Sequence, residues 1–154
     1  MLRLSQLLGC AGRNPWGVGV GKIVTRWKAW GSSDWQFNNP ATNGVPIVRL
    51  RYSADGSYWW IADSVSSNGP IDRSISPVGM WPYWSVLVDN AGDTRIAEVE
   101  FYDSGGLIAQ GVGTQIGNAT QNGGLAAAFD GNTSQVQANC AYSNSGFGYV
   151  GKHY

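Results

Sequence analysis

The sequence predicts an all-β domain, an antiparallel β-sandwich or jelly roll. Short segments alternate apolar and polar residues, and turns rich in Gly, Asn, Asp, Ser and Pro separate them about every ten to fifteen residues. No long amphipathic helix pattern occurs. The chain of 154 residues is long enough for one domain with its own core. We expect that sandwich over residues 21–154, preceded by an N-terminal arm over residues 1–20.

Composition narrows the classes of partner. The formal net charge is zero, charged residues make up only 13% of the chain, and basic residues are scattered. This argues against nucleic acid or an anionic membrane surface as the main partner. No apolar run approaches the ~18 residues of a membrane span, so no membrane insertion is expected. The 22 glycines and 8 tryptophans suit a turn-rich β domain of an extracellular or virion protein.

The first half of the chain is expected to hold four strands, at residues 22–30, 46–52, 58–62 and 82–89. In the first of them, alternation turns only one of Trp27 and Trp30 toward the core. Residues 63–80 contain several turn signals and are expected to form a loop.

The second half is expected to hold strands at residues 94–103 and 146–154, with a helical turn at 124–129. The former alternates, placing Glu98 and Glu100 on one face and Val99 and Phe101 on the other. The ordinary interpretation of such a face is that both glutamates are solvated.

The N-terminal arm carries Leu4, Leu7 and Leu8 at helical spacing, which favours packing on its own domain or on a sister subunit. Cys10 and Cys140 are the only cysteines. Two cysteines alone make neither a disulfide framework nor a zinc site, and two unpaired thiols are favoured over a bridge.

Several segments together resemble a discoidin-type, galactose-binding-like domain. IAEVEFY at 96–102, FDGNT at 129–133 and GYVG at 148–151 resemble the front half of that family. GSSD at 31–34 and YSADGSYW at 52–59 resemble its back half, so the two halves stand in inverted order. Circular permutation, exchange of halves between subunits, or excision from a tandem array would each explain that order. The resemblance predicts that Tyr154 ends beside the 22–30 strand of the same or a neighbouring subunit.

The resemblance also implies a structural calcium ion at the FDGNT loop. The ligands carried over would be Asp130, Asn132, the Ala128 carbonyl and Glu98, which supply the oxygen atoms that calcium prefers. The chain departs from the family at Gln135, where the family commonly has Thr. The alternative is a plain Asx turn without an ion.

Sugar binding by this fold, as the resemblance implies, would use aromatic side chains on the end loops together with a few polar groups. The candidate aromatics are Trp35, Phe37, Tyr58, Trp60 and Trp81. Nearby polar candidates are Asp34, Gln36, Asn38, Asn68 and Arg73. The alternative for each aromatic is a lid over the sandwich end or a subunit contact. Trp59 and Trp84 match framework aromatics of the family and are expected in the core.

Catalysis has little support in the sequence, because the one histidine, His153, is penultimate and no motif marks a partner for it. We expect a non-catalytic, carbohydrate-binding adhesion module, part of a phage or virus particle as a tail-fibre, receptor-binding or capsid-decorating protein. Its partners would be cell-surface or polysaccharide glycans and other virion proteins, and we expect a homo-oligomer. A structural virion assembly or capsid-cementing protein without a sugar site, and a secreted or cell-surface location, are the alternatives.

Overall fold

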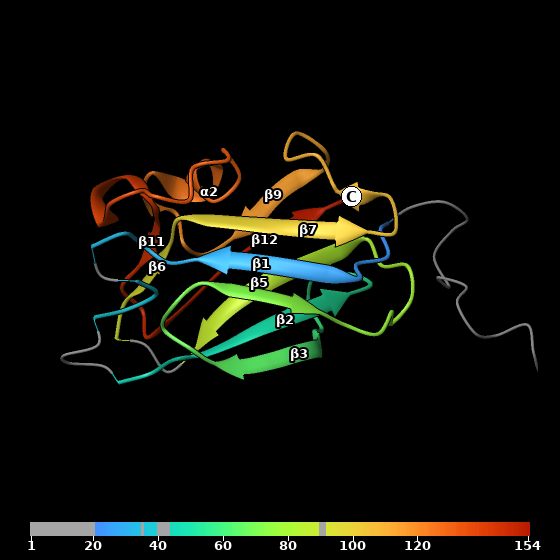
Figure 1. Ribbon diagram of the computed structural model, residues 1–154, viewed down its shortest axis with the longest axis horizontal. Coiled ribbons are helices and arrows are strands. Elements are labelled where there is room, and N and C mark those ends of the chain that lie inside the picture. Colours follow the sequence, from blue (N-terminus) through green and yellow to red (C-terminus); the bar gives the residue numbers. More distant parts are fainter. Residues whose placement is uncertain (1–20, 35, 40–43, 90–91) are drawn as a thin grey trace, which may run out of the picture.

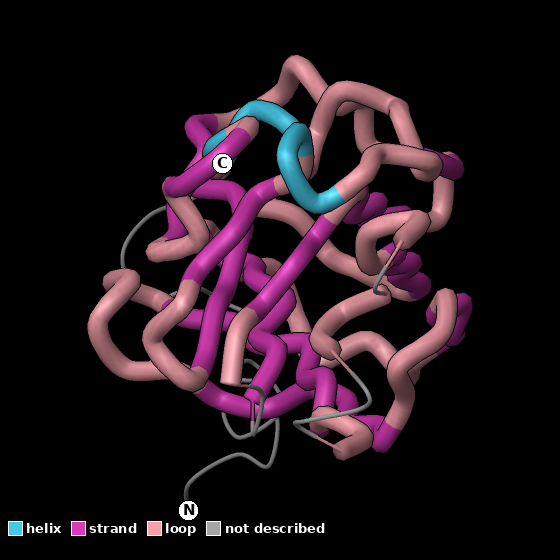
Figure 2. The backbone as a smooth tube through the Cα atoms, turned by 90° about the vertical axis from the view of Figure 1, so that its left-hand side faces the viewer, coloured by secondary structure: helices cyan, strands magenta, loops and turns pink. Residues whose placement is uncertain are grey.

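A computed structural model describes residues 21–34, 36–39, 44–89 and 92–154. Antiparallel strands dominate these residues and form two main sheets packed face to face, which confirms the all-β sandwich (Figure 1). A small third sheet and a short helix lie at one end of the sandwich, and Figure 2 looks toward that end.

One main sheet has five strands in the order β3-β2-β5-β12-β9. Its strands are β2 (Ile47–Ser53), β3 (Trp60–Ser66), β5 (Tyr83–Asp89), β9 (Thr114–Gly117) and β12 (Phe147–His153). The other main sheet has four strands in the order β4-β1-β7-β8. Its strands are β1 (Arg26–Trp30), β4 (Ile71–Ser74), β7 (Glu98–Asp103) and β8 (Gly106–Leu107).

The remaining elements are short. The third sheet joins β6 (Thr94–Ile96), β10 (Gln121–Asn122) and β11 (Ala141–Ser143). The helix α2 (Gly124–Ala127) confirms the expected helical turn, and a 3-10 turn follows at η2 (Gln137–Asn139). Neither of these described helices has the length needed to cross a membrane.

The core lies between the two main sheets and follows the predicted alternation. From the five-stranded sheet, inward side chains such as Leu50, Val86 and Val150 are fully buried. From the other sheet Trp27 and Val99 meet them, and both are fully buried as well. Trp27 is therefore the inward residue of the predicted pair, whereas the side chain of Trp30 is partly exposed.

The two halves of the chain pair with each other. β5 of the first half pairs with β12 of the second along seven residues, and β1 pairs with β7. The sandwich therefore closes within one chain. The Tyr154 amide donates a hydrogen bond to the Pro82 carbonyl at 2.8 Å, and the preceding residue, Trp81, pairs with Lys22. Tyr154 thus lies near the start of the predicted 22–30 strand, but the neighbours of β1 itself are β4 and β7.

Three expectations about strands need correction. β3 extends to Ser66, and β4 occupies part of the predicted 63–80 loop. The predicted 94–103 strand is interrupted at Ala97, where it passes from the third sheet into the four-stranded sheet. β4 was missed because its last three residues are exposed and polar, so it carries no apolar alternation.

Cys140 is a free and buried thiol, and its Sγ donates to the Gln137 carbonyl at 3.3 Å. Burial raises the pKa of this thiol to about 11. Cys10 lies outside the described residues, so the state of the two thiols as a pair stays a prediction.

Candidate functional site

Three aromatic side chains gather at the end of the sandwich where β2 ends and β3 and β5 begin. The Tyr52 ring stacks on Trp60 with centroids 5.8 Å apart and lies 4.9 Å from the ring of Trp81. Trp60 and Trp81 are 5.6 Å apart, and the buried Trp84 lies next to Tyr52 at 5.7 Å. We call Tyr52, Trp60 and Trp81 the aromatic cluster. It joins two of the aromatics predicted to bind sugar.

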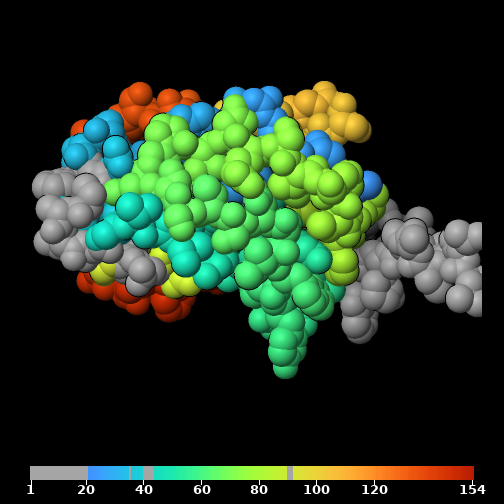
Figure 3. Space-filling model, turned by 60° about the horizontal axis from the view of Figure 1, so that its bottom comes forward, coloured from blue at the N-terminus to red at the C-terminus, as the bar shows by residue number. Residues whose placement is uncertain are grey.

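The cluster is open to solvent at Trp60, whose side chain is 47% exposed, and Tyr58 in the preceding turn is 76% exposed. The green segment in Figure 3, the turn between β2 and β3 with the start of β3, protrudes from the body of the molecule. Asp55 holds this turn by accepting hydrogen bonds from the Ser57 and Tyr58 amides at 2.8 and 3.0 Å. These amides lower the pKa of the Asp55 carboxyl, so the turn is fixed by a charged acceptor.

The other predicted aromatics do not join the cluster. Phe37 is fully buried, so the prediction that its ring contacts a surface ligand is wrong. Its carbonyl accepts a hydrogen bond from the Arg95 amide at 2.9 Å, which fixes the segment against the third sheet and turns the ring into the core. Trp35 lies outside the described residues, and its predicted role stays a prediction.

The polar groups predicted beside the aromatics lie elsewhere. Gln36 and Asn68 line a pocket at the opposite end of the sandwich, where Asn68 follows the end of β3 and Trp60 begins it. Asn38 is fully buried, and Arg73 on β4 holds Asp63 of β3 through two hydrogen bonds at 2.6 and 3.0 Å. Asp34 accepts from the Gln137 amide at 3.0 Å. The sequence-based prediction therefore combined into one site residues that lie at two different ends of the fold.

The predicted calcium ligands do lie in one region, but protein donors already surround their oxygens. Asp130 accepts from the Asn132 amide at 2.8 Å and from Gln135 Nε2 at 2.7 Å. Asn132 Oδ1 accepts from the Ser134 amide at 3.1 Å, and the Ala128 carbonyl accepts from Val99 at 2.8 Å. In the part of the chain that the structure describes, no group of three or more His, Cys, Asp or Glu side chains is arranged to hold a metal. These oxygens therefore already have protein donors in the absence of an ion, and the calcium site stays a prediction.

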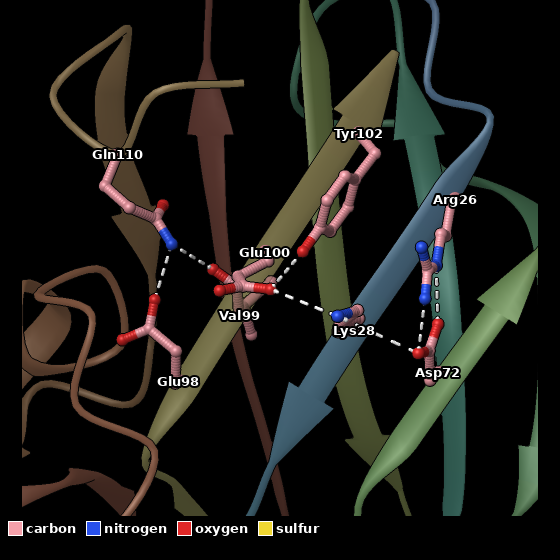
Figure 4. A network of polar contacts seen from close by, with 8 residues as sticks. All are labelled: Arg26, Lys28, Asp72, Glu98, Val99, Glu100, Tyr102 and Gln110. Atoms are coloured by element: carbon pink, nitrogen blue, oxygen red, sulfur yellow. Dashed lines mark hydrogen bonds and ion pairs between the residues drawn. The ribbon is translucent and has the colours of Figure 1, made fainter. Parts of the chain in front are cut away.

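Glu98 is fully buried, which corrects the expectation of a solvated side chain. It faces the same side of β7 as Glu100, but the loops that carry Gln110 and Gly131 cover it. Gln110 Nε2 donates to one of its carboxyl oxygens (Figure 4), and the Gly131 amide donates to the other at 2.9 Å. Burial raises the pKa of Glu98 to about 8, although the Gly131 hydrogen bond acts in the opposite direction.

The outer face of the four-stranded sheet carries a ladder of paired charges (Figure 4). Arg26 holds Asp72 through two hydrogen bonds at 2.7 and 2.6 Å, and Lys28 lies between Asp72 and Glu100 at 3.8 and 4.0 Å. The Tyr102 hydroxyl donates to Glu100 at 2.6 Å. This face is charge-balanced, which suits a solvated surface better than a ligand site.

The outer face of the five-stranded sheet is aromatic, and the sequence prediction missed it. The Arg51 guanidinium lies 4.7 Å from the Trp59 ring and 4.9 Å from the Tyr149 ring. Trp59, expected in the core, is instead partly exposed and covers this outer face. The His153 ring stacks on Tyr83 with centroids 4.1 Å apart. Strand alternation could have revealed this face, because Arg51, Tyr83, Tyr149 and His153 all point away from the core.

Comparison with known proteins gives no further guide to the site: no family model, curated protein or solved structure matches this chain.

Proposed function

We propose that the protein is a non-catalytic carbohydrate-binding module and that the aromatic cluster is its sugar site. The observation that carries this proposal is the exposed Trp60 ring, held in place against Trp81 and Tyr52. The C–H face of a sugar packs on such a ring, and a ring fixed by its neighbours loses little rotamer freedom on binding. The protruding turn that carries Tyr58 adds a second aromatic at the rim.

Resemblance supports the biological setting of the proposal. The discoidin-like motifs, in permuted order, lie in a chain whose sandwich closes on itself. In the setting we propose, the protein is a component of a phage or virus particle that attaches to cell-surface or polysaccharide glycans. It forms a homo-oligomer there and contacts other virion proteins.

The test is a glycan array with the purified protein, run once with calcium and once with a chelator. Trp60→Ala removes the exposed ring, and we expect it to weaken the best glycan signal about tenfold or more, the equivalent of ~1.4 kcal/mol. Phe147→Ala is the matched control, because Phe147 is 46% exposed but lies at the far end of β12. An equal loss of glycan signal in both variants, or no loss in either, would contradict the proposal that the aromatic cluster is the sugar site.

The alternative is an assembly protein that uses the same surface to bind a protein. Ile61, 57% exposed, extends the apolar surface beside Trp60. An array without signal, together with an oligomer that Trp60→Ala dissociates in size-exclusion chromatography, would favour this alternative.

A further inference from the structure

A second candidate site lies at the opposite end of the sandwich from the aromatic cluster. It is a pocket of about 210 Å³ between the end of β1, the turn that follows it, the β3–β4 connection and the 130–134 loop. Figure 2 shows this loop-rich end from the front. The lining residues used below are Trp30, Ser32, Ser33, Gln36, Asn68 and Thr133.

The lining combines one aromatic ring with uncharged polar groups. Trp30 supplies an apolar surface, and the other five side chains named supply hydroxyl and amide groups. None of the lining side chains is charged, and Lys28, whose Nζ lies 5.9 Å from the centre of the Trp30 ring, already lies between Asp72 and Glu100. A carboxylate or ammonium ligand would therefore lose its hydration here without a free opposite charge to replace it, which is costly. A ligand with hydroxyl groups on one side and a C–H face on the other could form hydrogen bonds with the polar side chains and pack its C–H face on the Trp30 ring.

Backbone hydrogen bonds hold the described part of the pocket wall. Ser32 and Gln36 exchange two backbone hydrogen bonds at 2.9 and 2.7 Å, and Gln36 adopts a left-handed backbone with φ of 62°. A side chain at Gly31 would meet the Gln36 carbonyl carbon at 2.1 Å, so only glycine permits the turn. The Ser33 amide donates to the Gln135 carbonyl at 2.8 Å, which ties the turn to the 130–134 side of the pocket.

Asn68 leaves a hydrogen-bond donor beside this pocket. Its Oδ1 accepts from the Asn38 amide at 3.2 Å, which fixes the orientation of the side-chain amide. Within the described residues its buried Nδ2 has no hydrogen-bond partner. An unpaired buried donor is costly, and this nitrogen would gain an acceptor if the Asn68 side chain turned toward a ligand oxygen in the pocket.

We propose that this pocket binds one neutral, hydroxyl-rich ring, such as a single unit of an uncharged saccharide. The volume is below the roughly 300–1,000 Å³ of sites that enclose drug-sized ligands, which limits the occupant to about one ring. The inference is independent of the aromatic cluster. If both sites bind sugar, one protein can hold two glycans at opposite ends of the sandwich.

The experiment is a titration of isotope-labelled protein, followed by amide NMR, with glucose, galactose, mannose and N-acetylglucosamine, and with glucuronate as the charged probe. We expect saturable shifts at the Ser32, Ser33 and Gln36 amides with at least one neutral sugar, and at least tenfold weaker binding of glucuronate. Thr133→Trp places a large ring at an exposed lining position and should abolish these shifts. Thr133→Ser is its matched control and should retain them.

Trp60→Ala separates the two sites. Shifts that survive Trp60→Ala but vanish in Thr133→Trp support the pocket, whether or not the aromatic cluster binds. Sugar binding that Trp60→Ala abolishes and Thr133→Trp spares would support the aromatic cluster and overturn the pocket. Absence of shifts at millimolar sugar, or tighter binding of glucuronate than of every neutral sugar, would also overturn it.

Discussion

Gln135 Nε2 donates a hydrogen bond to Asp130 Oδ2 at 2.7 Å. The same nitrogen also donates to the Ala127 carbonyl at 3.1 Å, so one amide group joins two oxygens of a loop in which the resemblance implies a calcium ion. The side chain of Gln135 is buried, and it stands where the family commonly has Thr. In this chain a neutral donor therefore joins one implied calcium ligand, Asp130, to the Ala127 carbonyl.

The first prediction is that the 127–135 loop depends on Gln135 and not on calcium. Gln135→Ala should lower the free energy of unfolding by about 1–3 kcal/mol, because two acceptors lose their shared donor. Gln121→Ala is the control: the exposed Gln121 side chain donates a long hydrogen bond to Asn144 Oδ1 at 3.4 Å, and this variant should stay within about 0.5 kcal/mol of the wild type. Urea unfolding of each variant measures the difference.

The same protein should melt at an unchanged temperature in millimolar calcium and in EDTA. A melting temperature that rises with calcium concentration would contradict this account and restore the calcium site, because a ligand bound only by the folded state must stabilise it.

The second prediction concerns pH and Glu98. Its pKa is raised from 4.5 to about 8 in the folded protein by burial, so between these values the folded state binds a proton that the unfolded state has lost. Stability should therefore fall as the pH rises from about 5 to 8. Around Glu98, the charges of Asp130 and Glu100 raise this pKa further, and Lys152, whose Nζ donates to the Gln110 carbonyl at 2.7 Å, is a nearby cation.

Urea unfolding at several pH values checks the prediction, and Glu98→Gln should flatten the slope in this window. Groups whose pKa is lowered, such as Asp63 and Asp72, act in the opposite direction, and their contribution is lost only as the pH falls below their ordinary range near 4. A wild-type slope that matches that of Glu98→Gln between pH 5 and 8 would show that Glu98 is ionised in the folded state.

The third prediction concerns Arg51, which lies between Trp59 and Tyr149. Burial lowers its pKa to about 10, and its terminal NH2 nitrogen has no hydrogen-bond partner within the described residues. Its Nε donates to Ser85 Oγ at 3.2 Å, and beyond this long hydrogen bond the side chain contributes mainly through packing. Arg51→Met should stay within about 1 kcal/mol of the wild type, whereas Arg51→Ala should cost about 2 kcal/mol. Equal losses in thermal or urea unfolding would mean that the charge, not the packing, stabilises this face.

The sequence predicted the sandwich well because its strands alternate clearly, as at Leu50 and Val86. It could not predict the burial of Glu98, because the loops that cover this residue come from elsewhere in the chain and leave no local signal. The prediction that the Phe37 ring is exposed was wrong for a related reason. A loop aromatic next to Asn and Pro looks like a surface residue in the sequence, but the turn after β1 directs this ring into the core. The pocket at Trp30 was missed because strand alternation says which face a side chain takes, but not which loops cover that face.

For the aromatic cluster, the sequence indicated the aromatic residues but not the polar residues that lie beside them. Trp60 and Trp81 were expected on the end loops because the resemblance implies sugar-binding aromatics there, and the two rings do meet at one end of the sandwich. Their polar companions were assigned by closeness in sequence, and the fold places Gln36 and Asn68 at the opposite end.

The most direct test of the central claim is the affinity of wild type, Trp60→Ala and Phe147→Ala for the strongest glycan found on the array, measured by calorimetry. The account predicts saturable binding by the wild type, a loss of about tenfold or more in Trp60→Ala, and unchanged binding in Phe147→Ala. Undiminished binding in a folded Trp60→Ala variant, or a wild type that binds no glycan, would contradict the claim that the aromatic cluster is a carbohydrate site.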